Sequence, residues 1–359
     1  MISSEGENLV FLLSLPRSGS TLLSLLLGGH STLLCPPEPW FLLKLATFMQ
    51  FGTVDHAFDE KWATIGIQAF LHDNLFIKSA RAFATTAYNN YLQTEGKTIF
   101  VDKTPRYFHI LPFLDELFPK ARKIWLKRHP LDVALSYKKT WGIDTKIITG
   151  QITLPVSFDF AVGLFALISY FENSSPNKLE IQYETLVHSP RETLNRICRF
   201  IDIKFEEQML NYAENQALTT QYNMAVMGDK NVLSTRAIHA HSVEKWSQEL
   251  TPTEIEQMVA LLGQDVFCQM GYCKTLETLQ TLGIKLCSET EAAEARNRLR
   301  LSASDETTQK SQINQLFLAN KELRSQLHQL QNSRSWRLTA PLRKIVTSLK
   351  ELRRHQSVI

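Results

Sequence analysis

Short apolar runs alternate with longer segments of helical periodicity along most of the chain. Leu9–Leu15 is an unbroken apolar run that ends at Pro16, as a strand buried on both faces does. Comparable runs occupy residues 98–101, the stretch "RKIWLKRHP" and residues 178–182, and helical spacing follows each of them. This repeated order of strand, crossover helix and strand predicts an α/β fold with a parallel sheet flanked by helices.

Polar clusters stand where the predicted strands end. They are Pro16–Thr21, "DKTPRY" from Asp102, Arg128–Pro130 and Tyr183–Glu184. In open parallel sheets, ligands bind beyond the carboxyl ends of the strands. We therefore expect these four clusters to meet in one site.

The α/β pattern stops near Tyr272, which predicts a first domain over residues 1–275. Residues 276–310 are polar and indicate a linker, and residues 311–332 carry three heptads with a polar Asn320 at one a position. Such an Asn sets coiled-coil register, so this stretch predicts a short coiled coil and a homodimer. The alternative is a single amphipathic helix packed on its own domain.

The excess of positive charge lies at the end of the chain. Residues 333–359 hold seven Lys or Arg and one acid, whereas the whole chain has a formal charge of only +3. Apolar residues interleave with the arginines in "SRSWRLTAPLRKI", which favours contact with an anionic membrane surface or with another protein. The stretch resembles a segment found after coiled coils in bacterial glycan-processing enzymes. A solvated basic end is the alternative.

Composition narrows the class of protein. The near-neutral charge gives no indication of nucleic-acid binding. Five scattered cysteines without a CxxC motif argue against a disulfide framework or a zinc site and favour a reducing compartment. The start of the chain has no signal-peptide pattern, and Pro16 and Arg17 interrupt its apolar run. We expect a cytoplasmic protein, peripheral to the inner membrane if the tail binds lipid.

The loop from Pro16 to Thr21 has the composition of an anion-binding turn. Backbone N–H groups at a helix N-terminus bind anions, and Arg17 adds a fork of donors. A Walker A loop needs GxxxxGK[ST], and this loop lacks its first Gly and its Lys. The bound anion is thus not expected to be a magnesium-bound triphosphate. An ordinary turn with a surface arginine is the alternative.

A second anion-binding pair is spaced eight residues apart after the third strand. Arg128 ends that strand and Ser136 lies in the following helix. A guanidinium and a hydroxyl so placed are suited to clasp a phosphate. The alternative is an arginine paired with Asp132.

Taken together, the two segments resemble the sulfotransferase family, which uses 3′-phosphoadenosine 5′-phosphosulfate (PAPS). The resemblance covers about residues 8–275 and implies a P-loop-like fold. It implies that Arg17, Ser18, Gly19, Ser20 and Thr21 bind the 5′-phosphosulfate, and that Arg128 and Ser136 bind the 3′-phosphate. By weaker resemblance, Tyr183, Ser234 and Lys245 also contact the nucleotide, although Lys230 replaces the proline of a familiar Gly-Asp-Pro-Asn loop.

The base is identified through the branches of the family. Cytosolic small-molecule sulfotransferases use a histidine after Lys-Thr, and here Pro105 occupies that place. In the tyrosylprotein branch a glutamate beyond the first helix is the base, and Glu38 in "PPEPWF" matches its spacing from Arg17. This motif also resembles bacterial and polyketide-line sulfotransferases. Glu38 is thus the expected base, and His109 is the weaker candidate for this role. The non-catalytic alternative for Glu38 is a helix-capping or solvated carboxylate.

The expected chemistry is in-line transfer of a sulfuryl group to an acceptor hydroxyl. Glu38 would take the proton, while Arg17 and Lys103 stabilise charge on the leaving nucleotide, without a metal. Lys103 as a surface residue is the alternative. The acceptor is expected to be a glycan, a lipid-linked saccharide or a natural product. Two other functions stay open: an inactive nucleotide-binding scaffold, and a nucleotide kinase, against which the missing Walker lysine argues.

Overall fold

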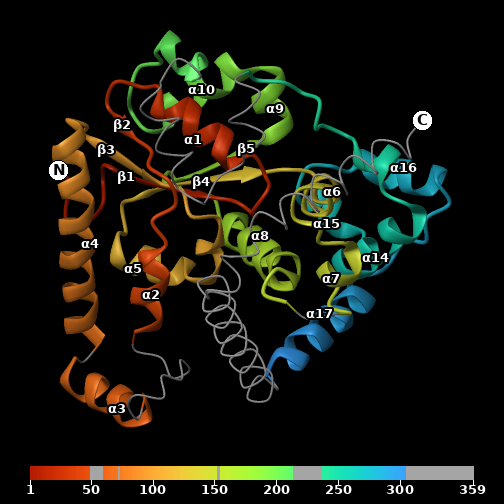
Figure 1. Cartoon of the computed structure of the whole chain (residues 1–359), viewed down its shortest axis with the longest axis horizontal. Helices are drawn as coiled ribbons and strands as arrows, with labels where there is room; N and C mark the ends of the chain where they lie inside the picture. The colour runs from red at the N-terminus through yellow and green to blue at the C-terminus, as the bar shows by residue number, and fades with distance from the viewer. Residues whose placement is uncertain (49–59, 72, 152–153, 213–236, 305–359) are drawn as a thin grey trace, which may run out of the picture. The chain divides into compact units, whose positions relative to one another are not determined.

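A parallel five-stranded sheet in the order β2-β3-β1-β4-β5 forms the centre of the chain. The computed structural model describes residues 1–48, 60–71, 73–151, 154–212 and 237–304, and a compact unit extends from Met1 to Leu299. The predicted α/β architecture is confirmed (Figure 1). The strands are β1 Leu9–Leu13, β2 Leu33–Leu34, β3 Ile99–Asp102, β4 Arg122–Lys127 and β5 Lys178–Gln182. Four of them were expected; β2, with two residues, is too short for a sequence pattern to reveal.

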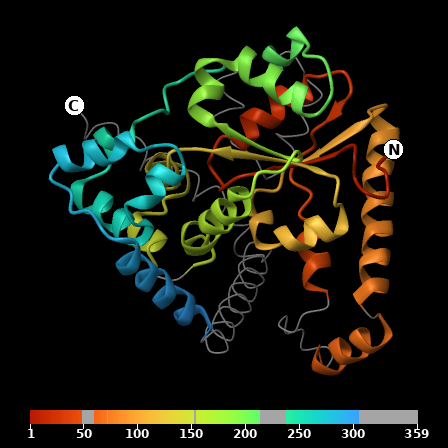
Figure 2. The same ribbon diagram turned by 180° about the vertical axis from the view of Figure 1, so that it is seen from behind.

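Helices cover both faces of the sheet. Helices α1, α9 and α10 lie on one face, and α5, α8 and the 3-10 helix η1 lie on the other (Figures 1 and 2). Up to β5 the helices are α1 Ser20–Gly28, α2 Phe41–Thr47, α3 Glu60–Phe70, α4 Asp73–Glu95, η1 Pro105–His109, α5 Leu111–Leu117, α6 Pro130–Trp141, α7 Thr145–Ile148, the π-helix η2 Asp159–Gly163 and α8 Leu164–Glu172. After β5 come α9 Tyr183–His188, α10 Pro190–Phe200, η3 Glu207–Leu210, α13 Trp246–Glu249, α14 Pro252–Leu262, α15 Asp265–Gln269, α16 Lys274–Thr281 and α17 Glu289–Ser304.

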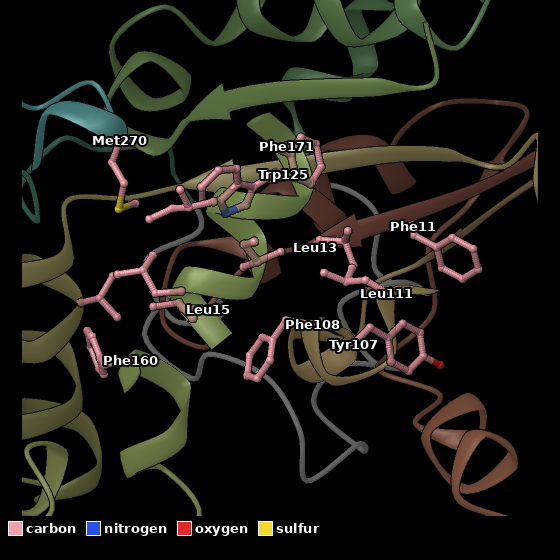
Figure 3. Packing of buried hydrophobic residues seen from close by; sticks show 14 of the residues in the cluster. Phe11, Leu13, Leu15, Tyr107, Phe108, Leu111, Trp125, Phe160, Phe171 and Met270 are labelled. Atoms are coloured by element: carbon pink, nitrogen blue, oxygen red, sulfur yellow. The ribbon is translucent and has the colours of Figure 1, made fainter. Parts of the chain in front are cut away.

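Strand β1 shows why its sequence is apolar at every position. Leu9, Phe11 and Leu13 pack into the core on the η1 and α5 face, as Figure 3 shows for Phe11 and Leu13. Val10 and Leu12 pack on the α1 face. Because side chains alternate along a strand, a central strand covered by helices needs apolar residues at all positions.

The compact unit continues past the boundary that the sequence indicated at residue 275. Leu279, Ile284 and Leu299 are buried in its core. Arg296 on α17 donates hydrogen bonds to the carbonyls of Leu261 and Leu262. These bonds cap the C-terminal end of α14. Residues 276–299 thus belong to the compact unit, and their polar composition reflects helices that bury only one side.

One disulfide departs from the expectation drawn from the cysteine count. Cys268, at the end of α15, is joined to Cys273, directly before α16. Gly271, with φ +87° in the left-handed region, lies in the turn between the two cysteines. The pairing depends on this tight turn, which the spacing of five residues did not reveal.

Several predicted features lie outside the described residues: Ser234, the heptads of residues 311–332 and the basic tail 333–359. Within the described part of the chain, no helix combines the length and apolar character that crossing a membrane requires.

Candidate active site

Each strand of the sheet is followed by one predicted site residue. Glu38 follows β2, Lys103 follows β3, Arg17 follows β1, Arg128 follows β4 and Tyr183 follows β5. All strands are parallel, so these residues share one edge of the sheet. The strand order puts Glu38 and Lys103 toward one side, Arg128 and Tyr183 toward the other, and the Arg17 loop between them.

The loop after β1 contains two residues with positive φ, a conformation that glycine adopts readily and arginine does not. Arg17 has φ +65° and Gly19, the residue before α1, has φ +91°. A Cβ atom on Gly19 would lie 2.4 Å from Cδ2 of Tyr183. Glycine is required both by the backbone conformation and by this close approach. Strained backbone of this kind is frequent at functional sites.

The Arg17 side chain joins the loop to helix α6. Its Nε donates to Oγ of Ser136 at 3.2 Å, and its Nη2 donates to Oγ1 of Thr140 at 3.2 Å. The two predicted anion-binding segments are therefore in direct contact. Thr140 was missed by sequence reasoning, although its position four residues after Ser136 puts both hydroxyls on one helix face.

Arg128 connects three parts of the site. Its Nη1 donates to the carbonyl of Arg17 and its Nη2 to the carbonyl of Ser242, both at 2.8 Å. Its guanidinium lies 4.6 Å from the centre of the Tyr183 ring. The residue is 8% exposed, and its Nε is buried without a hydrogen-bond partner among the described residues. The guanidinium thus has a donor left for a ligand.

Asp132, in the first turn of α6, holds the segment that carries Lys245. Its Oδ2 accepts the N–H of Glu244 at 2.8 Å and its Oδ1 accepts the N–H of Trp246 at 2.9 Å. Glu244 has φ +57°, which turns both N–H groups toward the carboxylate. Burial raises the pKa of Asp132 to about 6, although Arg128 and the two N–H donors oppose the rise.

These residues surround one pocket, which we call the donor pocket. Six of the predicted residues line it: Arg17, Gly19, Arg128, Ser136, Tyr183 and Lys245. Its other lining residues are Leu22, Asp132, Leu135, Lys139, Thr140, His239, His241, Ser242 and Glu249. Ser18, Ser20 and Thr21 are buried in the loop and in the first turn of α1 and are not among the lining residues.

Glu38 and Lys103 form a separate ion pair outside the donor pocket. Oε1 of Glu38 accepts from Nζ of Lys103 at 2.7 Å, and Oε2 accepts from Nε1 of Trp40 at 2.9 Å. Lys103 is 0% exposed, whereas the Glu38 side chain is 13% exposed. Trp40 has φ +60°, so its indole reaches back to Glu38 from the start of α2. Lys103 is therefore a buried ion-pair partner instead of a surface residue.

Glu38 lines a second cavity of about 620 Å³. Prolines and aromatic rings make up most of its wall, among them Phe41 and Tyr91. Helix α4 contributes Ala87, Tyr88, Tyr91 and Glu95 to this cavity. The Glu38 carboxylate is thus open to a space other than the donor pocket.

A buried carboxylate fixes the chain directly before Lys103. Asp102 accepts hydrogen bonds from the hydroxyls of Tyr88 at 2.6 Å, Tyr107 at 3.0 Å and Thr104 at 2.9 Å. Burial raises its pKa to about 6, and the three donors oppose this rise. A satisfied buried network of this kind rigidifies its surroundings.

The histidines divide into two kinds. His30 is structural, since its Nε2 contacts the carbonyl of Lys204 at 2.8 Å. His109, the alternative base, is exposed at the end of η1. His239 and His241 both line the donor pocket.

Comparison with known proteins identifies the family. A profile described as "Sulfotransferase family" matches residues 10–207. The nodulation protein NoeE of Sinorhizobium fredii is 33% identical over 293 residues, which cover 76% of this chain and 68% of NoeE. Among solved structures, the sulfotransferase domain of the curacin biosynthetic pathway aligns with a TM-score of 0.53 at 23% identity, over 73% of this chain and 97% of that domain. The sulfotransferase domain of the Synechococcus PCC 7002 olefin synthase gives 0.50 at 24% identity, over 78% and 95%. The family profile and the NoeE alignment show that this chain belongs to the sulfotransferase family.

Proposed function

We propose that this protein transfers a sulfuryl group from PAPS to the hydroxyl group of an acceptor. The observation that carries the proposal is the donor pocket, where the Arg17 loop and the Arg128–Ser136 pair meet although 111 residues separate the two arginines. Two anion-binding segments at one pocket suit a nucleotide with phosphates at two positions. Family membership supplies the reaction class.

The residues of the donor pocket suit the nucleotide in different ways. The loop from Arg17 to Gly19 would hold the 5′-phosphosulfate at the start of α1, where backbone N–H groups and the helix dipole favour an anion. Arg128 and Ser136 would hold the 3′-phosphate, and Arg128 has its buried Nε available. Lys245, fixed through Asp132 and the neighbouring N–H groups, adds positive charge.

The Glu38–Lys103 ion pair would carry out the transfer together with Arg17. The acceptor oxygen attacks sulfur, the new O–S bond forms, and the bond from sulfur to the bridging oxygen of the nucleotide breaks. Glu38 takes the acceptor proton, and Lys103 with Arg17 stabilises the negative charge on the released adenosine 3′,5′-bisphosphate (PAP). The hydrogen bond from Nζ of Lys103 to Oε1 of Glu38 fixes the orientation of the carboxylate that would take the proton.

The alternative functions make different demands on these residues. A nucleotide kinase needs the Walker lysine that the loop lacks. A scaffold without catalysis gains little from this pair, because removing two charges from water can cost more free energy than their attraction returns. The pairing of Glu38 with Lys103 favours the enzyme.

Ligand-dependent thermal unfolding tests the donor. PAP at 100 times its Kd should raise the unfolding free energy by about 2.7 kcal/mol and Tm by several degrees, and ATP should have little effect. Stabilisation by ATP and not by PAP would favour the kinase. Transfer of ³⁵S from labelled PAPS to components of a cell extract then tests catalysis, and mass spectrometry of the labelled products identifies the acceptor.

The end of the chain carries a separate part of the proposal. Residues 311–332 would form a homodimeric coiled coil, and residues 333–359 would bind anionic lipid. Sedimentation of the full-length protein with anionic and with neutral liposomes tests the tail. Equal recovery in the supernatant with both would contradict it.

A further inference from the structure

Two residues that line the donor pocket each have a buried nitrogen atom that lacks a hydrogen-bond partner among the described residues. One is Nε of Arg128, at the end of β4. The other is Nδ1 of His239, which lies 111 residues later in the chain. Buried polar nitrogens are almost always hydrogen-bonded in native proteins. Two exceptions at one pocket, from different segments, indicate a ligand that supplies the acceptors.

The segment that carries His239 is held against the pocket by contacts beyond the histidine itself. Arg128 donates to the carbonyl of Ser242, and Asp132 accepts the N–H groups of Glu244 and Trp246. The ring of His239 also stacks on His241, with ring centres 5.0 Å apart and planes 22° apart. These contacts place the imidazole before any ligand arrives, which lowers the entropic cost of binding.

We propose that His239 donates a hydrogen bond from Nδ1 to the same phosphate that Arg128 contacts through Nε, the 3′-phosphate of the nucleotide. The assignment rests on the proposed function. Arg128 supplies charge and His239 supplies a second donor from another side, so together they read a phosphate monoester that a nucleotide phosphorylated only at the 5′ position lacks. His239 is thus a residue that determines nucleotide specificity, and His241 supports its ring.

The chemistry of the imidazole suggests the matched substitutions. Asparagine carries an amide N–H near the position of Nδ1, so His239→Asn keeps a donor there. Leucine fills similar space without a donor, so His239→Leu removes the bond. His188→Leu is the control, because His188 is exposed at the end of α9 and does not line the donor pocket.

The two ligands are chosen to isolate the 3′-phosphate. PAP and adenosine 5′-diphosphate both carry two phosphate groups, but only PAP has one at the 3′ position. Calorimetric titration of each variant compares the Kd values of the two ligands. We expect His239→Leu to weaken PAP about tenfold and adenosine 5′-diphosphate less than twofold, as the loss of one hydrogen bond to a charged group predicts. His239→Asn should stay within about threefold of the unsubstituted protein for PAP.

The outcomes separate this inference from the proposed function. If the unsubstituted protein binds no PAP, the proposed function itself is wrong. If it binds PAP and His239→Leu weakens both ligands equally, or weakens neither, the assignment of His239 to the 3′-phosphate is wrong. The Tm of each ligand-free variant shows whether the fold is retained, and equal losses in His239→Leu and His239→Asn would also contradict a specific role for Nδ1.

Discussion

The two sides of the sheet edge are built differently. Over β1, β4 and β5, charged side chains of the donor pocket bond to backbone groups, as Arg128 does to the carbonyls of Arg17 and Ser242. Over β2 and β3, the Glu38–Lys103 pair lies among apolar and aromatic side chains. The hydrogen bonds to buried Asp102 fix the chain directly before Lys103. One side has two buried nitrogens, Nε of Arg128 and Nδ1 of His239, that lack a partner among the described residues, and the other holds an ion pair.

The difference matches the two tasks of a group-transfer site. Binding a nucleotide with several phosphates requires many donors at a surface that opens to water. Proton transfer requires one carboxylate in a fixed orientation, and burial of its partner lysine provides that. The donor side should therefore control affinity and the base side should control turnover, a division that substitutions can test.

The largest effect is expected on the base side. Glu38→Gln removes the proton acceptor and keeps the shape, so turnover in the ³⁵S transfer assay should fall about 10²- to 10⁴-fold. The Kd for PAP should stay within about threefold, because Glu38 does not line the donor pocket. Near-normal turnover would show that another group is the base, and His109→Ala would then be the next variant to assay.

On the donor side, Arg128→Ala should weaken PAP about 100-fold, since truncation of a buried, charged hydrogen-bond partner costs about 2–5 kcal/mol. Arg122→Ala is the matched control: Arg122 begins the same strand and pairs with the exposed Asp202. Calorimetry measures both. Equal affinities in the two variants would mean that Arg128 does not bind the nucleotide.

The close approach of Gly19 to Tyr183 can be separated from its backbone conformation. Gly19→Ala and Gly142→Ala both place a side chain at positive φ, but a Cβ at Gly142 meets nothing within 4 Å. We expect Gly19→Ala to lower the unfolding free energy by about 2 kcal/mol more than Gly142→Ala, because only the first variant collides with the ring. Urea denaturation measures the difference, and equal losses would show that Tyr183 moves aside at no cost.

The smallest effect is the pH dependence of stability that the two buried carboxylates share. Burial raises the pKa of Asp102 and of Asp132 from 3.8 to about 6 in the folded state. The native protein thus binds these protons more readily than the unfolded chain, and each group makes the unfolding free energy rise as the pH falls from about 6 toward 4. Urea denaturation at pH 7.5 and at pH 5 measures this rise in the unfolding free energy. The rise should be smaller in Asp102→Asn and in Asp132→Asn than in the unsubstituted protein.

At pH 7.5 the two Asn variants should differ in stability. In Asp102→Asn the hydroxyl of Thr104 can reverse and accept from the new amide, so stability should be retained. In Asp132→Asn one of two fixed backbone N–H groups would face the amide NH₂, which should cost about 1–3 kcal/mol. Equal stability of the two variants would contradict this account.

Local motifs predicted most of the donor side. The strand–loop–helix of residues 9–28 and the Arg128–Ser136 pair were correctly placed beside strands because phosphate-binding loops depend on short-range geometry. The residues that reasoning missed, Thr140, His239, His241 and Ser242, come from a helix face and from a segment without a motif. Only the helical spacing from Ser136 could have identified Thr140.

The sequence by itself determined the layers of the fold, the order of the strand ends and the kinds of donor gathered there, since hydrophobic periodicity and loop chemistry are local properties. Only the tertiary structure decided the pairing of Glu38 with Lys103, the role of Asp132 as an acceptor for distant N–H groups, the Cys268–Cys273 disulfide and the packing of residues 276–299. Each depends on contacts between segments far apart in sequence or on left-handed backbone at residues such as Trp40 and Glu244. Neither hydrophobic period nor motif spacing encodes such contacts, because they arise only once the strands and helices have packed.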